Sequence, residues 1–277
     1  MARKVVILSS FLLTFLITVL NSYEPAASFE RGMANPSNQW QLVWFDEFNY
    51  RGLPNPLKWT YEEGFVRNNE AQYYTRARRQ NVWVENGMLV IEARKEKYQN
   101  AKYTSASVTT NKRASWRYGR IEVKAKLPTG QGMWPAIWML GTNYPEVEWP
   151  LCGEIDIMEN VGYDPNVIHA HVYTQAFNYM TRNVKGSSIV IPLPHTEFHI
   201  YAMEWFKDRI DFFVDDRKYF TFKNTGNGID EWPFDGEHYL ILNAAIGGGW
   251  GGKKGIDDRI FPQKYYIDYV RVYQQTN

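Results

Sequence analysis

Three acidic side chains lie close together in the stretch GEIDIMEN, and their spacing could support acid–base chemistry. They are Glu154, Asp156 and Glu159. On a strand, Glu154 and Asp156 share a face, but Glu159 is five positions from Glu154 and a regular strand would turn it to the opposite face. A helix does no better, because five residues rotate it by about 140°. A single-residue β-bulge near Ile157 or Met158 would bring all three carboxylates to one face.

Two carboxyl groups on one face can hydrolyse a glycosidic bond. In retaining glycosidases these groups stand about 5–5.5 Å apart, one attacking the anomeric carbon and the other acting as acid and then as base. After a bulge the two glutamates are four effective positions apart, or about 13 Å along a strand, so their side chains must lean together on a concave face. Asp156 would hydrogen-bond the nucleophile and add negative charge, which helps keep the acid/base protonated.

The same triplet could instead be a calcium site or a solvated acidic strand. The apolar residues between the acids argue against a solvated strand, because Ile155, Ile157 and Met158 would bury the other face. Calcium-binding loops are usually polar and glycine-rich, and this stretch is not. Catalysis is therefore the preferred interpretation, and the two others stay open at this point.

The elements that must position these acids are predicted to be strands. Residues 121–127 alternate apolar and charged side chains, as a half-buried strand does. Residues 209–222 predict a hairpin turning at Asp215 and Asp216, and Asn86-Gly87 is a strong two-residue turn signal. Residues 239–246 and 266–273 are further strand candidates. Short strands with regular turn signals predict an all-β fold, a sandwich or jelly roll.

The N-terminus is predicted to be an export signal. Arg3 and Lys4 precede an apolar run, and small residues follow it. We expect a signal peptide over 1–27, with an approximate end, a linker over 28–39 and a single catalytic domain over 40–277. The mature chain would then be secreted, extracellular or periplasmic, without stable membrane association. Cys152 is the only cysteine, so no internal disulfide can form.

The composition argues against one class of partner and favours another. The net charge of +1 leaves no basic excess for nucleic acid. Aromatic residues make up 16% of the chain, and flat rings with a polar edge suit both sandwich cores and the stacking of sugar rings.

Beyond these patterns, the sequence resembles glycoside hydrolase family 16, in particular its laminarinase-like members. GEIDIMEN looks like that family's active-site strand, of pattern E-x-D-x-x-E, and further blocks follow the family order: LVWFDEFN, NNEAQYYT, GRIEVKAKLP, GMWPAIWML, FHIYAMEW, ILNAAIGGGWGG and YIDYVRVYQ. The resemblance implies a jelly roll of two curved antiparallel sheets with an open cleft on the concave face. It also implies Glu154 as nucleophile and Glu159 as acid/base. The implied activity is that of a monomeric endo-β-1,3-glucanase acting on laminarin, with no cofactor for the chemistry.

The resemblance also suggests residues that bind the glycan. Trp134 and Trp138 are four apart and could floor a groove, although Trp138 could equally be core. Trp134 and Trp250 match sugar subsites, and three other positions match cleft-lining residues of the family: Asn68, Glu70 and Arg94. His169 matches the first histidine of a family pattern, but Tyr173 stands where the second is expected. His169 and His171 could also share a metal, although no third ligand lies nearby in sequence.

A structural calcium ion is a further implication of the resemblance. Its ligands would come from Glu47, Gly87 and Asp268, although Asp268 could equally be an ordinary strand residue. Other functions remain as alternatives: a mixed-linkage β-1,3-1,4-glucanase, an agarase-like enzyme, or a glucan-binding jelly roll without activity. An intact acid/base pair argues against the last of these.

Overall fold

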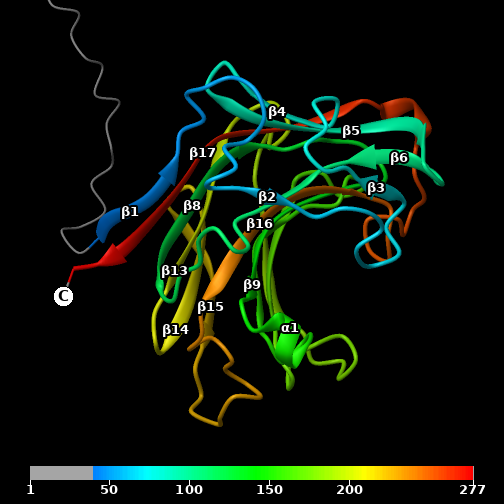
Figure 1. Ribbon diagram of the computed structural model, residues 1–277. Helices are drawn as coiled ribbons and strands as arrows, with labels where there is room; N and C mark the ends of the chain where they lie inside the picture. The colour runs from blue at the N-terminus through cyan, green and yellow to red at the C-terminus, as the bar shows by residue number, and fades with distance from the viewer. Residues whose placement is uncertain (1–39, 277) are drawn as a thin grey trace, which may run out of the picture. The chain divides into compact units, whose positions relative to one another are not determined.

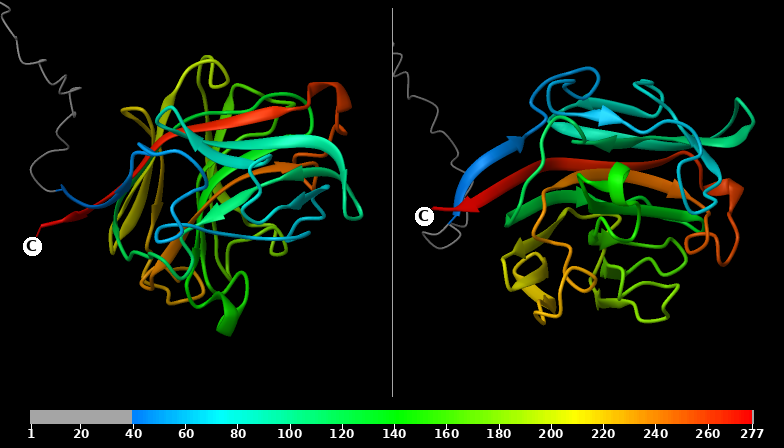
Figure 2. Two further views of the ribbon diagram at one scale, coloured as in Figure 1. Left: turned by 45° about the horizontal axis from the view of Figure 1, so that its top comes forward. Right: turned by 60° about the horizontal axis from the view of Figure 1, so that its bottom comes forward.

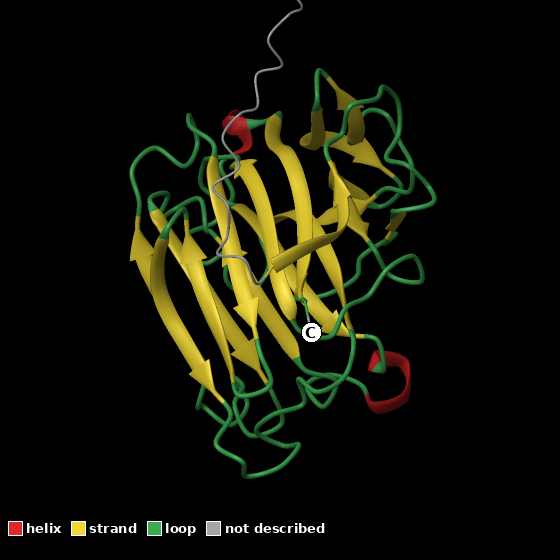
Figure 3. Cartoon of the chain, turned by 90° about the vertical axis from the view of Figure 1, so that its left-hand side faces the viewer, coloured by secondary structure: helices red, strands yellow, loops and turns green. Residues whose placement is uncertain are grey.

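The structure is a computed structural model that describes residues 40–276. The signal peptide and linker predicted over 1–27 and 28–39 lie outside the described residues. Almost all of the regular structure is strand, arranged in two sheets (Figure 1). The helical segments are two short ones, α1 (Tyr144–Val147) and the 3-10 helix η1 (Asp258–Ile260), drawn in red in Figure 3.

The larger sheet has ten strands. Its main path runs in the order β15 (Arg217–Lys223), β14 (Arg209–Val214), β13 (His199–Trp205), β8 (Gly119–Lys126), β17 (Gln263–Gln275), β5 (Met88–Tyr98), β6 (Ala101–Ser105) and β3 (Gln72–Tyr74). Two more strands join it at the side, β1 (Trp40–Asp46) on β17 and β4 (Val82–Glu85) on β5. The neighbours are antiparallel except β3 and β6, which are parallel.

The smaller sheet has seven antiparallel strands and carries the acidic stretch. Its order is β12 (Lys185–Val190), β11 (Val167–Tyr173), β10 (Glu154–Glu159), β9 (Met133–Gly141), β16 (His238–Ile246), β7 (Ser107–Thr109) and β2 (Thr60–Tyr61). The acidic strand β10 therefore lies inside the sheet, between β9 and β11.

Local sequence explains several of these elements. The apolar positions of β8, Ile121, Val123 and Ala125, are fully buried in the core between the sheets. Asn86 and Gly87 both have positive φ, 52° and 74°, as a type I′ turn between β4 and β5 requires. The hairpin predicted over 209–222 is also present, as β14 and β15. The all-β prediction is confirmed.

Long-range pairing completes the larger sheet. The first and last strands, β1 and β17, lie side by side although more than 200 residues separate them (Figure 2).

Within residues 40–276, no helix has the length and apolar character needed to cross a membrane.

Candidate active site

A β-bulge in β10 brings the three carboxylates to one face. On β9, Asp156 pairs with Trp138 while Met158 pairs with Ile137, so one extra residue of β10 is accommodated between them. Ile157 and Met158 are both fully buried in the core. Two consecutive core-facing residues return Glu159 to the face of Glu154 and Asp156, which we call the outer face of the smaller sheet. The predicted bulge is confirmed.

Glu154 is surrounded by groups that favour its ionised form. Trp149 Nε1 donates a hydrogen bond to Glu154 Oε2 (2.8 Å), and Asp156 hydrogen-bonds the same carboxylate. Burial nevertheless raises the pKa of Glu154 to about 7, reinforced by the negative charge of Glu159 and opposed by the positive charge of Arg67. Glu154 can therefore ionise near neutral pH.

Asp156 is the least exposed of the three carboxylates. Its side chain is 3% exposed, and burial, followed by the charges of Glu154 and Glu159, raises its pKa well above the usual range. A raised pKa favours the protonated form of Asp156, which can donate a hydrogen bond to Glu154. The predicted contact with Glu154 is present, and burial opposes the negative charge that we expected of Asp156.

Glu159 is held by two aromatic residues from neighbouring strands. Trp134 Nε1 on β9 donates to Glu159 Oε1 (3.0 Å), and His171 Nδ1 on β11 lies 2.8 Å from Glu159 Oε2. The His171 ring fills the space beside Gly186 of β12, where an added Cβ would lie 2.2 Å from the ring's Cδ2. Glu159 therefore has a fixed orientation and a neighbour that can exchange a proton with it.

An aromatic cluster lies beside Glu159. The ring of Trp250 stands edge-on to Trp134 (centroids 5.7 Å apart) and to His169 (4.9 Å). Gly248 permits this approach, because its φ is +72° and an added Cβ would lie 3.2 Å from Trp134 and 3.1 Å from Glu70. The fold thus brings the predicted residues Trp134, His169 and Trp250 together beside Glu159.

Two more predicted residues, Asn68 and Glu70, lie beside the glycine-rich loop that contains Gly248 and Trp250. Glu70 is 7% exposed and accepts hydrogen bonds from Asn68 Nδ2 (3.3 Å) and Gln72 Nε2 (2.6 Å). The backbone oxygen of Asn68 accepts a bond from the Gly249 amide (3.1 Å). Asn68 and Glu70 therefore hold the loop that carries Trp250, and direct contact of either with glycan stays a prediction.

The remaining predicted residues are placed differently. Trp138 is 6% exposed and donates a hydrogen bond to Asn243 Oδ1 (2.8 Å). The guanidinium of Arg67 covers its ring (4.7 Å), so Trp138 supports Arg67 from beneath. Arg94 lies on β5 of the larger sheet, where Glu92 and Glu96 are its ionic partners among the described residues. Direct contact of Arg94 with glycan stays a prediction.

Tyr173 pairs with Glu154 across β10 and β11 and lies on the same outer face. Its ring is 5.9 Å from Trp149, which in turn stacks on Tyr179 (5.2 Å, 22°). The departure from the family pattern at Tyr173 thus adds an aromatic ring beside Glu154.

The strand register brings the predicted calcium ligands to the same part of β17, because Asp46 pairs with Val270 and Leu89 pairs with Ile267. The carboxylate of Glu47 forms two bonds with Arg271 (2.7 and 2.9 Å), and Asp268 pairs with Lys124 (2.9 Å). Gly87 lies in the turn between β4 and β5. A cation bound by both carboxylates would have to displace these two basic side chains, and the calcium ion stays a prediction.

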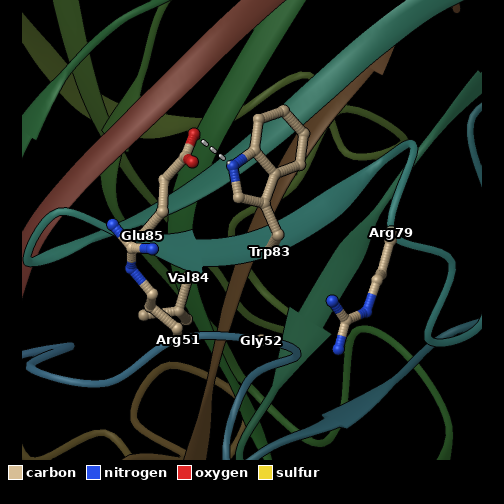
Figure 4. Close-up of a pocket in the computed structure, with 6 residues that line it drawn as sticks. All are labelled: Arg51, Gly52, Arg79, Trp83, Val84 and Glu85. Atoms are coloured by element: carbon tan, nitrogen blue, oxygen red, sulfur yellow. Dashed lines mark hydrogen bonds between the residues drawn. The ribbon is translucent and has the colours of Figure 1, made fainter.

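The larger sheet carries a separate hollow of about 430 Å³ beside β4. Arg51, Arg79 and Trp83 line it, and Trp83 donates to Glu85 (2.6 Å), as Figure 4 shows. None of the three carboxylates of β10 is among its lining residues.

Sequence reasoning missed three residues of the site: Arg67, Trp149 and His171. Arg67 adjoins the predicted Asn68, and Trp149 lies five residues before Glu154, so proximity was the one available signal. The sequence suggested His171 only as a metal ligand together with His169, and that site lacked a third ligand nearby in sequence. In the structure, Asp156, Glu159 and His171 each place a possible metal-ligand atom within 4.8 Å of the others. The acidic neighbours of His171 therefore come from β10, which is distant from it in sequence.

This arrangement of carboxylates agrees with the comparison to known families. Residues 69–271 match glycosyl hydrolases family 16. The chain belongs to this family.

Family 16 relatives resemble the chain over most of its length. A β-glucanase of Rhodothermus marinus is 50% identical over 244 residues, which is 85% of each protein. The X-ray structure of the laminarinase from Rhodothermus marinus has a TM-score of 0.83 and 48% identity, covering 86% of this chain and 98% of that one. SCLam, a non-specific endo-β-1,3(4)-glucanase of the family, has a TM-score of 0.83 and 47% identity, covering 88% and 94%. The jelly-roll prediction and the resemblance to laminarinase-like members are confirmed.

Proposed function

We propose that this protein is a retaining endo-β-1,3-glucanase that hydrolyses β-glucans such as laminarin. The observation that carries this proposal is the bulge in β10, which aligns Glu154 and Glu159 on one face and gives each different partners. The relatives described as β-glucanase and laminarinase support the substrate class. Chemistry of this kind uses the two carboxyl groups and needs no cofactor.

The surroundings of the two glutamates divide their roles. Glu154 receives hydrogen bonds from Trp149 and from the neutral Asp156, and Arg67 adds a positive charge nearby. These three groups stabilise a carboxylate, as a nucleophile requires. Glu159 is paired with His171, which can hold or return the proton that an acid/base must transfer.

The reaction proceeds in two displacements. Glu154 attacks the anomeric carbon while Glu159 gives its proton to the departing glycosidic oxygen, which yields a glycosyl ester on Glu154 and a free chain end. Glu159 then takes a proton from water, whose oxygen attacks the anomeric carbon and releases Glu154 as carboxylate. Configuration is retained because the carbon inverts twice.

The substrate assignment is tested by the release of reducing sugar from laminarin, lichenan and agarose. We expect the wild type to hydrolyse laminarin fastest and Glu154→Ser to be inactive, while a matched control on an exposed loop, Glu197→Ser, keeps full activity. Binding of laminarin without hydrolysis by the wild type would favour the glucan-binding alternative. Activity on agarose but not laminarin would refute the substrate assignment.

A mixed-linkage activity is the second candidate. It is favoured by the similarity to SCLam, which is described as a non-specific endo-β-1,3(4)-glucanase. Comparable rates on laminarin and lichenan would support it.

The roles of the two glutamates are tested by azide rescue. With an activated β-glucoside, azide should attack Glu154→Ser directly and give the α-glucosyl azide, whereas Glu159→Ala should give the β-product through the glycosyl ester. The opposite stereochemistry would reverse the assignment.

Export and assembly form the last part of the proposal. The N-terminal apolar run supports cleavage of a signal peptide near residue 27 and release of the chain without stable membrane association. We further propose that the released chain is a monomer. N-terminal sequencing and the mass of the released protein test this.

Because Glu47 and Asp268 have basic partners, we expect a chelator to leave the melting temperature unchanged. A large drop in the melting temperature would instead support the calcium ion that the family resemblance implies.

A further inference from the structure

Three side chains with metal-binding atoms meet on the outer face of the smaller sheet. Asp156 and Glu159 of β10 and His171 of β11 each place one such atom within 4.8 Å of the others. Within residues 40–276 the group contains these three side chains and not His169, so it differs from the histidine pair that the sequence suggested. Its donor atoms suit a cation, a property that the reaction described above does not use.

Strand pairing fixes the group in place before any ion arrives. Asp156 lies directly opposite His171 in the pairing of β10 with β11, and opposite residues point to the same side of a sheet. The bulge then turns Glu159 to this side as well, and its Oε2 lies 2.8 Å from His171 Nδ1. An ion bound here would therefore require little ordering of the side chains.

One oxygen of the group is buried without a donor. Asp156 is 3% exposed, and no N–H or hydroxyl group among the described residues reaches its Oδ2. Buried acceptors are normally paired, because an unpaired one costs free energy. Glu154 and Glu159 also surround Asp156 with like charge. A cation would supply the missing partner of Oδ2 and reduce this repulsion.

The dimensions of the group are close to those of a zinc site. With ligand bonds of about 2.0–2.1 Å, neighbouring ligand atoms of a tetrahedral site lie about 3.3 Å apart. The contact between His171 and Glu159 would open by about 0.5 Å, and no other separation would close by more than about 1.5 Å. Trp134 can keep its hydrogen bond to Glu159, because it uses Oε1 and leaves Oε2 for the ion.

The ligand types select the class of metal. An imidazole nitrogen with carboxylate oxygens suits Zn²⁺ and related transition metals, whereas calcium takes six to eight oxygen ligands. Three protein ligands leave a fourth position for water, as in open zinc sites. The side chain of His171 is 17% exposed, which gives an ion a path from solvent.

We propose that Asp156, Glu159 and His171 bind a divalent transition-metal ion such as Zn²⁺, and that the bound ion inhibits hydrolysis. A carboxylate must lose its proton to coordinate a metal, so Glu159 with its oxygen on the ion has no proton for the departing glycosidic oxygen. The displaced proton goes to solvent. Metal binding is independent of the proposed glucanase function, whereas the inhibition rests on it.

Calorimetric titration of the metal-free protein with zinc chloride tests the site. We expect one ion per chain, and His171→Ala and Asp156→Asn should each weaken binding at least tenfold, since loss of even an outer partner of a ligand typically costs about 10–100-fold. His195→Ala is the matched control, because it removes an imidazole from the loop between β12 and β13 and should leave the affinity unchanged. Melting temperatures without zinc show whether each variant is folded.

Inhibition is measured by initial rates on laminarin. Saturating zinc should lower the rate of the wild type at least tenfold, and excess chelator should restore it. Magnesium or calcium at the same concentration should leave the rate unchanged, because neither prefers an imidazole ligand.

The outcomes separate the two proposals. No binding of zinc, or equal affinity in wild type and His171→Ala, would overturn the metal site while the glucanase assignment stands. Tight binding with an unchanged rate on laminarin would overturn the inhibition. Metal-free wild type that does not cleave laminarin would overturn the glucanase function, whereas the titration would still decide the metal site.

Discussion

The hydrogen bond from Trp149 to Glu154 is expected to set the acidic limb of the pH profile. Trp149→Phe keeps an aromatic ring against Tyr179 but removes the Nε1 donor, 2.8 Å from Glu154 Oε2. A hydrogen bond to a charged group contributes about 1.5–3 kcal/mol, and one pKa unit corresponds to about 1.4 kcal/mol. Glu154 is partly exposed, so we take the lower end of this range, or about one unit.

The sign of the shift follows from the state that the bond favours. Because the indole N–H stabilises the carboxylate, its removal raises the pKa of Glu154 above its present value of about 7. The acidic limb of kcat/KM should then move up by about one unit, so that activity at pH 6 falls by about tenfold and approaches the wild-type value at alkaline pH. Initial rates on laminarin between pH 4 and pH 9 measure this.

A matched control tests whether the effect is local. Trp83 Nε1 donates to Glu85 Oε1 (2.6 Å) on the larger sheet, so Trp83→Phe removes the same kind of bond away from the carboxylates (Figure 4). Its pH profile should match the wild type. Coincident acidic limbs for wild type and Trp149→Phe, or an equal shift in Trp83→Phe, would refute the reasoning.

Three further predictions concern stability, positioning and binding. The pKa of Glu154 rises from 4.5 to about 7 on folding, so its ionisation lowers the free energy of unfolding as pH rises through this window. Glu154→Gln should therefore be more stable than wild type by about 1–3 kcal/mol at pH 8 and equally stable at pH 4, as measured by urea denaturation; a pH-independent difference would contradict this. Gly186→Ala should lower kcat several-fold, because its Cβ would displace His171, whereas Gly236→Ala, with open space around it, should not. Equal rates for the two alanine variants would argue against that role of His171. Trp250→Ala should raise KM for laminarin about tenfold through loss of a stacking surface, and an unchanged KM would exclude contact with glycan.

Much of the fold and the central chemistry could be read from local patterns. The odd spacing of Glu154 and Glu159 required a bulge, because strand alternation allows no other way to put both on one face. The alternation in β8 and the turn at Asn86-Gly87 likewise follow from side-chain period and backbone conformation within a few residues. These features depend on neighbours in sequence, so the sequence alone determined them.

Other properties depend on contacts between residues that are distant along the chain. Arg67 reaches Trp138 and influences Glu154 only because the loop before β3 folds over β9 and β10. The pKa of Asp156 is raised because the fold buries it beside two other acids, which no local pattern could reveal. Arg94 matched a cleft position but pairs with acids of its own strand on the larger sheet. Tertiary structure decided these points, because burial and electrostatic interaction depend on distance in space and not on separation in sequence.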